Sequence, residues 1–173
     1  TFEPRFSMNY DITNYWRINS SINLNNRFGR INQVYYNYIL VNYRKIQNID
    51  TPLPETQNIS YSSLIGYRNP VKALFLNLTY TKTITDKNLL YKTQILDNGS
   101  INFNAIEKDN IKITHNFSAK GSKYMSSLKT NMTISTNYSL QDFEQILNSE
   151  TVDISNKNWT FKGKLDIDIN DWL

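Results

Sequence analysis

The sequence has no cysteine, only five glycines and four prolines, and a single histidine among its 173 residues. The absence of cysteine excludes a disulfide scaffold, Cys-bound zinc and a thiol nucleophile. Five glycines leave little material for a loop that cradles phosphate, and the sequence matches none of the common nucleotide-binding, serine-hydrolase or zinc-protease motifs. His115 has no second imidazole or thiolate to complete a transition-metal site. We therefore expect no catalytic residue, no metal, no cofactor and no enzymatic activity.

Long hydrophobic runs are also missing. No uninterrupted apolar stretch approaches the ~20 residues that a membrane-spanning helix needs, and the mean hydropathy of the chain is -0.54. Twelve tyrosines, eight phenylalanines and three tryptophans nevertheless argue against intrinsic disorder. A membrane β-barrel reconciles these observations, because its strands need an apolar residue only at every second position.

The chain is moderately basic, with a net charge of +4 and a pI near 9.1. Such a charge first suggests nucleic acid as a partner. Here, however, the 19 lysines and arginines are scattered along the chain rather than clustered. We therefore do not expect nucleic-acid binding.

Alternation of apolar and polar residues is the main positive signal, because side chains on a strand point to opposite faces in turn. The longer runs approach or exceed the ~9–11 residues of a membrane-barrel strand, whereas soluble strands average ~5–6. Their enrichment in β-branched and aromatic residues favours strands over helices. The pattern is clear in residues 16–24, 111–119, 128–138 and 159–169, and weaker in residues 59–67. Residues 73–80 also alternate, with Phe75 as the exception.

The connections between these runs alternate in length. Asn98-Gly99 is a strong hairpin signal between two segments that still look extended, so those strands are expected to continue past the membrane and turn there. Short turns on one side and long loops on the other are typical of outer-membrane barrels. Short connections are expected at residues 11–14, 68–71 and 121–127 and after Asn170, and long polar excursions at residues 26–56, 85–110 and 140–158.

We therefore predict an all-β fold, an antiparallel up-and-down meander of about seven long strands that is part of a transmembrane β-barrel. Intact bacterial barrels have an even strand number and no free edge. Residues 1–173 are thus expected to form one partial barrel domain, truncated at both ends and without a plug domain. The lipid face is expected to carry Ile18, Ile22, Leu74, Leu76, Leu78, Ile134, Phe161, Leu165 and Ile167.

Four stretches carry a more specific signal: residues 42–56 (NYRKIQNIDTPLPET), 66–83 (GYRNPVKALFLNLTYTKT), 89–100 (LLYKTQILDNGS) and 105–125 (AIEKDNIKITHNFSAKGSKYM). In this order and spacing they resemble the barrel of TonB-dependent receptors, in particular outer-membrane proteins of the Bacteroidota. The first is similar to a family loop that ends in a Leu-Lys-Pro-Glu-type motif before a strand. Leu53-Pro54-Glu55 is present, but the preceding Asn-Pro-x-Leu-Lys is altered to Asp50-Thr51-Pro52-Leu53.

The resemblance implies a segment of a receptor and transporter barrel in the outer membrane of a Gram-negative bacterium, which binds a ligand and takes it up. The implied partners are outer-membrane lipid, an unknown nutrient ligand, a surface lipoprotein, and the TonB complex acting through the missing plug region. In the family the plug and its TonB-contacting segment drive transport. No mechanistic residue is therefore carried over to this chain.

The first long excursion contains a cluster of aromatic residues that we consider as a ligand site. Tyrosine offers a flat apolar ring with a polar tip, which suits stacking on a sugar, and Phe28 and Arg30 lie nearby in the sequence. The more common role of such rings is to pack a loop or to join the aromatic girdle of a barrel. The candidate ligand-binding residues are Tyr35, Tyr36, Tyr38 and Tyr43.

Other aromatic residues are expected at strand ends, where they would anchor the barrel at the membrane interface. These residues are Tyr15, Trp16, Trp159 and Trp172. His115 falls on the apolar side of its run, so a structural role is expected for it. Asp166 and Asp168 share the polar side of theirs, where Lys162 and Lys164 would offset their charge.

Two other functions are consistent with the same pattern. Strands with one wet face also occur in a soluble, secreted β-sandwich or adhesin-like binding module, although a sandwich turns every ~8–12 residues. A porin or an assembly factor would have a similar barrel wall. Only the resemblance to the receptor family separates these barrels from a TonB-dependent receptor.

Overall fold

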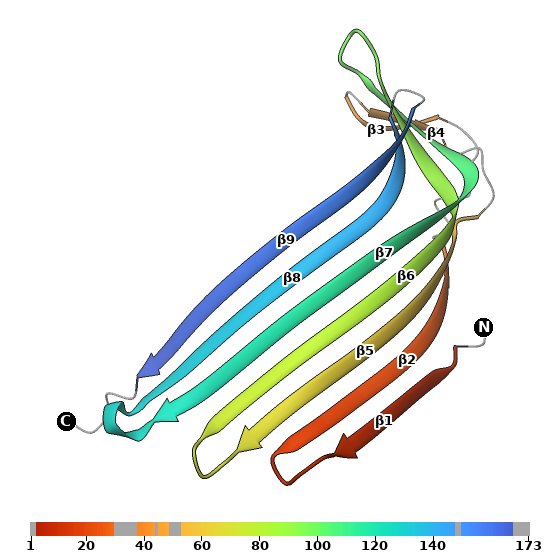
Figure 1. The fold of residues 1–173 in the computed structure, drawn as a ribbon. Coiled ribbons are helices and arrows are strands. Elements are labelled where there is room, and N and C mark those ends of the chain that lie inside the picture. The colour runs from red at the N-terminus through yellow and green to blue at the C-terminus, as the bar shows by residue number, and fades with distance from the viewer. Residues whose placement is uncertain (1–2, 30–37, 44, 49–52, 148–149, 168–173) are drawn as a thin grey trace.

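The computed structural model describes residues 3–29, 38–43, 45–48, 53–147 and 150–167. They form one curved sheet, in which seven long strands lie side by side (Figure 1). Each of the seven pairs antiparallel with the next along the chain, which confirms the predicted all-β meander. The strands are β1 (Arg5–Asp11), β2 (Trp16–Phe28), β5 (Glu55–Asn69), β6 (Leu74–Ile95), β7 (Ile101–Met125), β8 (Thr130–Leu147) and β9 (Glu150–Ile167).

Two shorter strands interrupt the meander between β2 and β5. β3 (Tyr38–Asn42) and β4 (Lys45–Asn48) form an antiparallel hairpin. β4 then runs parallel to the first residues of β7, at the end of the sheet where the long β6–β7 hairpin projects. The sheet is not closed, because the described parts of β1 and β9 each pair with only one neighbour.

Short turns join the strands at the opposite end of the sheet (Figure 1). Between β1 and β2, the Thr13 hydroxyl accepts hydrogen bonds from the backbone N–H groups of Tyr15 (3.2 Å) and Trp16 (3.1 Å). Between β5 and β6, the Asn69 side chain accepts one from Lys72 N–H (3.0 Å). A single 3₁₀ turn, Ser126–Leu128, joins β7 to β8. Such side-chain contacts to the backbone are the usual chemistry of tight turns.

The long hairpins differ from the prediction in one case and agree in another. β6 and β7 do continue to a turn at Asn98-Gly99, where Gly99 has a φ of 74° and Leu96 N–H donates to Ser100 O (2.9 Å). Residues 140–158, predicted as a loop, are instead mostly strand, because β8 and β9 stay paired up to Leu147 and Glu150. Apolar residues there fall on both sides of the strands, as Phe143 and Ile146 do, so the sequence shows no alternation although the backbone pairing continues.

Smaller corrections concern the ends of strands. Leu128 was predicted within a strand and lies in the 3₁₀ turn, and β7 runs on to Met125, so the connection expected at residues 121–127 is shorter. The first excursion is also shorter than expected, since β2 extends to Phe28 and β5 begins at Glu55. The connection predicted after Asn170 lies outside the described residues.

The pairing register gives the sheet two faces of opposite character. Register partners point to the same side, so one row across the sheet samples one face. On one side lies the row Tyr10, Ile18, Ile65, Leu78, Ala119, Thr136 and Phe161. On the other lies the row Asn9, Asn19, Leu64, Thr79, Ser118, Asn137 and Thr160. We call these sides the apolar face and the polar face.

Neither face of the long strands is covered by a second layer in the described part of the chain. Leu89 and Leu90, each 2% exposed, are the buried hydrophobic residues of the described structure, and both lie near the long-hairpin end. A β-sandwich would need a second sheet packed ≈ 10 Å away, and the described strands form a single sheet. No helix among the described residues is long and apolar enough to cross a membrane.

The turn before β6 provides a test of this fold. Ala73 has a φ of 45°, a left-handed conformation that disfavours residues with a Cβ atom. We expect Ala73→Gly to raise the free energy of unfolding by about 0.5–1 kcal/mol, since glycine adopts this conformation without strain. Ala119→Gly, within an extended strand, should lower it by about the same amount. Urea titration in detergent micelles, followed by circular dichroism, measures both, and equal effects of the two changes would contradict the turn geometry.

Candidate membrane-facing surface

The apolar face carries a band of mostly hydrophobic side chains on every long strand. Its small or polar members include Ser20, Ser63, Gly121, Thr136 and Gly163. On β2 the residues of this band run from Trp16 to Leu24, and on β9 from Trp159 to Ile167. Each span covers eight residue steps, or about 26 Å along the strand. These side chains remain accessible: Phe161 is 68% exposed and Leu165 is 61% exposed.

The band crosses the sheet obliquely. Trp16, the first band residue of β2, shares its register row with Gly163 of β9, so the band on β9 reaches four residues further toward the short turns. At the other border, Leu24 is in register with Ser155, four residues beyond Trp159. The two borders therefore shift together, and the band keeps its width.

The four-residue shift of the band between β2 and β9 gives the angle between the strands and the normal to the band. Four residues correspond to about 13 Å along a strand, and the five strand spacings from β2 to β9 to about 24 Å. The strands are therefore tilted by roughly 30° from the normal to the band, and the band is about 23 Å high. Membrane barrels have an apolar band of ≈ 25 Å and strands tilted by ≈ 35–45°.

Aromatic rings gather at both borders of the band. At the short-turn border, Trp16 packs on Tyr67 with 4.9 Å between ring centroids, and Tyr15 lies 6.2 Å from the same ring. At the other border Tyr80 packs on Phe117 (4.7 Å). Phe117 in turn lies 6.4 Å from Tyr138, and Trp159 follows in the same register row. We call Tyr80, Phe117, Tyr138 and Trp159 the ring row.

Of the predicted interface residues, Tyr15 lies in the turn before β2 and Trp16 begins that strand. Trp159 was expected at a strand end, which is wrong, because β9 begins nine residues earlier at Glu150. It lies instead at the border of the band, 74% exposed. Trp172 is outside the described residues.

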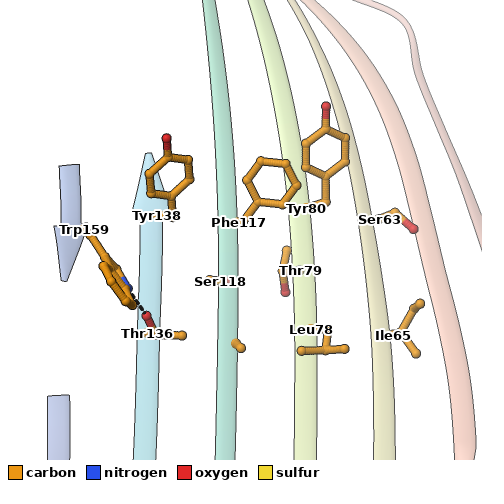
Figure 2. A pocket seen from close by; sticks show the side chains of 11 residues that line it. Ser63, Ile65, Leu78, Thr79, Tyr80, Phe117, Ser118, Thr136, Tyr138 and Trp159 are labelled. Carbon is orange, nitrogen blue, oxygen red and sulfur yellow. Dashed lines mark hydrogen bonds between the residues drawn. The ribbon is translucent and has the colours of Figure 1, made fainter. Parts of the chain in front are cut away.

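A shallow hollow of about 830 Å³ opens on the apolar face between these rings and Leu78 (Figure 2). Its floor is low because Ala119 and Thr136 are smaller than their neighbours in the same row. Trp159 leans across one end, where its indole N–H donates to the Thr136 hydroxyl (2.6 Å). A second hollow of about 430 Å³, which shares Leu78, Ala119 and Thr136, continues toward the short turns.

On β6, β7 and β9 the apolar face becomes basic in the register row next to Tyr80, Phe117, Tyr138 and Trp159. Lys82, His115 and Lys157 occupy this row together with Leu140, while β2 and β5 contribute the apolar Ile22 and Tyr61. The His115 Nδ1 lies 2.9 Å from the Tyr80 hydroxyl, and the two rings stack at 6.1 Å. This contact occupies one nitrogen of the histidine. The part of the chain that the structure describes contains no cluster of three or more metal-ligating side chains.

The polar face is held by small hydroxyl and amide side chains. Cross-strand hydrogen bonds join Ser60 to Thr83 and Ser62 to Thr81, each at 3.2 Å. Charged groups on this face form exposed pairs, among them Arg17–Asp11 (2.6 Å) and Lys164–Asp166 (2.7 Å). The Lys164–Asp166 pair agrees with the expected charge compensation on β9, while Asp168 lies outside the described residues.

The tyrosines proposed as a ligand site are not brought together in the described structure. Tyr35 and Tyr36 lie outside the described residues, as does Arg30. Tyr38 begins β3, and only its backbone is described. Tyr43 lies in the turn after β3 and is 86% exposed. The clustering in sequence therefore stays a prediction.

No family model, no curated protein and no solved structure matches the chain. The likeness to TonB-dependent receptors consequently depends on the four sequence stretches alone. The geometry of the two faces is an independent observation, and it is this geometry that we use below.

The hydrogen bond from the Trp159 indole to the Thr136 hydroxyl can be tested by substitution. Thr136→Val removes the acceptor of the indole N–H, which costs about 1–3 kcal/mol if no water replaces it. We therefore expect this variant to be less stable to urea in detergent micelles than Thr136→Ser, which keeps the hydroxyl. Equal stability of the two variants would indicate that the hydrogen bond from the Trp159 indole to the Thr136 hydroxyl contributes nothing in micelles, and it would contradict its role in holding the indole across the hollow.

Proposed function

We propose that the chain is a wall segment of an outer-membrane β-barrel of the TonB-dependent-receptor type, which contributes to binding and uptake of a nutrient ligand. The observation that carries this proposal is the oblique apolar band. A soluble sheet would hide such a band beneath a second layer, since exposed patches above a few hundred Å² are rare in soluble monomers. A hydrocarbon core would solvate it directly.

Three features of the band fit a bilayer together. Its height of about 23 Å is close to the ≈ 25 Å of membrane barrels, and its inclination of roughly 30° is near their range. Its borders carry Trp16 and Tyr67 on one side and Tyr80, Tyr138 and Trp159 on the other. Tryptophan and tyrosine favour these interfaces because one end of the ring is apolar and the other is polar.

The polar face would then line the lumen of the barrel. Its serine, threonine and asparagine side chains bond to one another across strands, as between Ser62 and Thr81. Its ion pairs are solvent-exposed, which suits a water-filled interior. The short turns would lie on the periplasmic side, and the β6–β7 hairpin would project outside the cell.

The two open edges fit a wall segment rather than a finished barrel. Unpaired backbone groups of β1 and β9 would be costly in hydrocarbon, so further strands are needed to close the sheet. A porin or an assembly factor would share this wall. The receptor type, the plug, the TonB complex, a surface lipoprotein and the nutrient ligand come from the resemblance of residues 42–56, 66–83, 89–100 and 105–125.

A matched pair of lysine substitutions tests which face meets lipid. Leu78 lies near the middle of the band, and Asn77 is its neighbour on the polar face. In micelles we expect Leu78→Lys to lower the free energy of unfolding by about 2–4 kcal/mol and Asn77→Lys to change it little. Urea titration by tryptophan fluorescence gives both values. Similar losses at the two positions would count against the assignment of faces.

The solvent requirement of the whole chain is a second test. We expect the purified chain to aggregate in buffer and to gain a β-sheet circular dichroism spectrum and a monodisperse elution profile in detergent micelles. The physical reason is that the apolar band has no protein cover in the described structure. A monodisperse protein that melts cooperatively in plain buffer would instead support the secreted binding module.

A further inference from the structure

Beside the ring row, two lysines stand on the apolar face without an acidic partner. Lys82 of β6 and Lys157 of β9 lie in the same register row and form no ion pair in the described structure. Two lysines outside this row do form ion pairs, Lys108 with Glu144 (3.4 Å) and Lys164 with Asp166 (2.7 Å). An unpaired cation at the border of an apolar band needs an anion from outside the chain or contact with water.

The other groups of this row add hydrogen-bonding capacity. His115 is the direct cross-strand partner of Lys82, so their Cβ atoms lie about 5 Å apart. The Tyr80 hydroxyl reaches His115 Nδ1 (2.9 Å), which orients the ring and leaves the other ring nitrogen available. Lys157 lies three strand spacings from Lys82, or about 14 Å. One carboxylate, Asp142, follows in the next row of the same face and pairs with neither lysine.

The hollow described above begins directly next to this row. Tyr80, Phe117, Tyr138 and Trp159 form its rim on the side of the lysines, and it continues along Ala119 toward the short turns. The row of basic side chains beside this apolar hollow matches the polarity of an amphiphile, with an anionic headgroup at the row and an acyl chain along the hollow. Lys123, a further lysine of the apolar face, lines the second hollow near the short turns.

We propose that the hollow and the adjacent row of basic side chains, together called the groove, bind a membrane lipid with a phosphorylated, anionic headgroup. The phosphate of the lipid contacts Lys82, His115 and Lys157, and an acyl chain lies along the hollow between Leu78 and Trp159. The proposal rests on the proposed function, because only a lipid-facing sheet presents this groove to a membrane. Phosphate is the expected group, since basic residues at a membrane border recognise lipids through it.

Quenching of Trp159 by brominated lipid tails tests this proposal, because Trp159 lines the hollow. The full chain, with Trp16→Phe and Trp172→Phe as background, is placed in bicelles of phosphatidylcholine and phosphatidic acid. Bromine is carried by the phosphatidic acid in one sample and by the same fraction of phosphatidylcholine in the other, so that the headgroup composition is identical. We expect stronger quenching by the brominated phosphatidic acid, with a preference of about fivefold per lysine.

The pair Lys82→Gln and Lys157→Gln should abolish this preference while quenching by brominated phosphatidylcholine remains. The matched control is Lys120→Gln with Lys162→Gln, which removes two lysines of one register row on the polar face and should leave the preference unchanged. The lipid site would be overturned if the chain with all its lysines showed no preference for brominated phosphatidic acid. It would also be overturned if both double variants lost that preference equally. Absence of quenching by either brominated lipid would instead overturn the membrane-facing surface itself.

Discussion

The structure depends on the in-register pairing of long antiparallel strands, which makes one residue in two on every strand point to the same side. Seven strands of alternating sequence thereby add their apolar residues into one band and their polar residues into another surface. A helix-based fold would bury such residues in a core. Here the hydrogen-bonded ladder holds the backbone together without one, and the apolar face is left to its surroundings.

The strands could be predicted from the sequence because alternation survives in the segments that form the band, such as residues 16–24 and 159–167. It fails beyond the band, in residues 140–158, which the sequence predicts as a loop: Leu140 and Ile146 fall on one side of β8 and Phe143 and Leu147 on the other. Backbone pairing there is set by the hairpin geometry and not by side-chain type. The turn at Asn98-Gly99 was predictable for a local reason. Gly99 has a φ of 74°, which glycine adopts without strain, and Asn-Gly is the sequence signal of such hairpin turns.

The groove and its basic rim could not be predicted in this way. Lys82, His115 and Lys157 are far apart in the sequence, the first two within alternating runs and Lys157 in a segment predicted as a loop. They become one row only through the pairings of four consecutive strands. A shift of a single residue in any of these pairings would move one of them to the other face. Register is thus the quantity that converts scattered residues into a surface.

The two buried leucines lie where strands contact one another beyond the band. Leu89 and Leu90 are each 2% exposed and lie beyond the band, where β6 and β8 run parallel for two residue pairs. Within the band, by contrast, Leu78 is 55% exposed and Phe161 is 68% exposed. Leu96 and Leu147, in the same part of the sheet, are each 41% exposed. Burial beyond the band is therefore set by local strand contacts, whereas no described element covers the apolar side chains within the band.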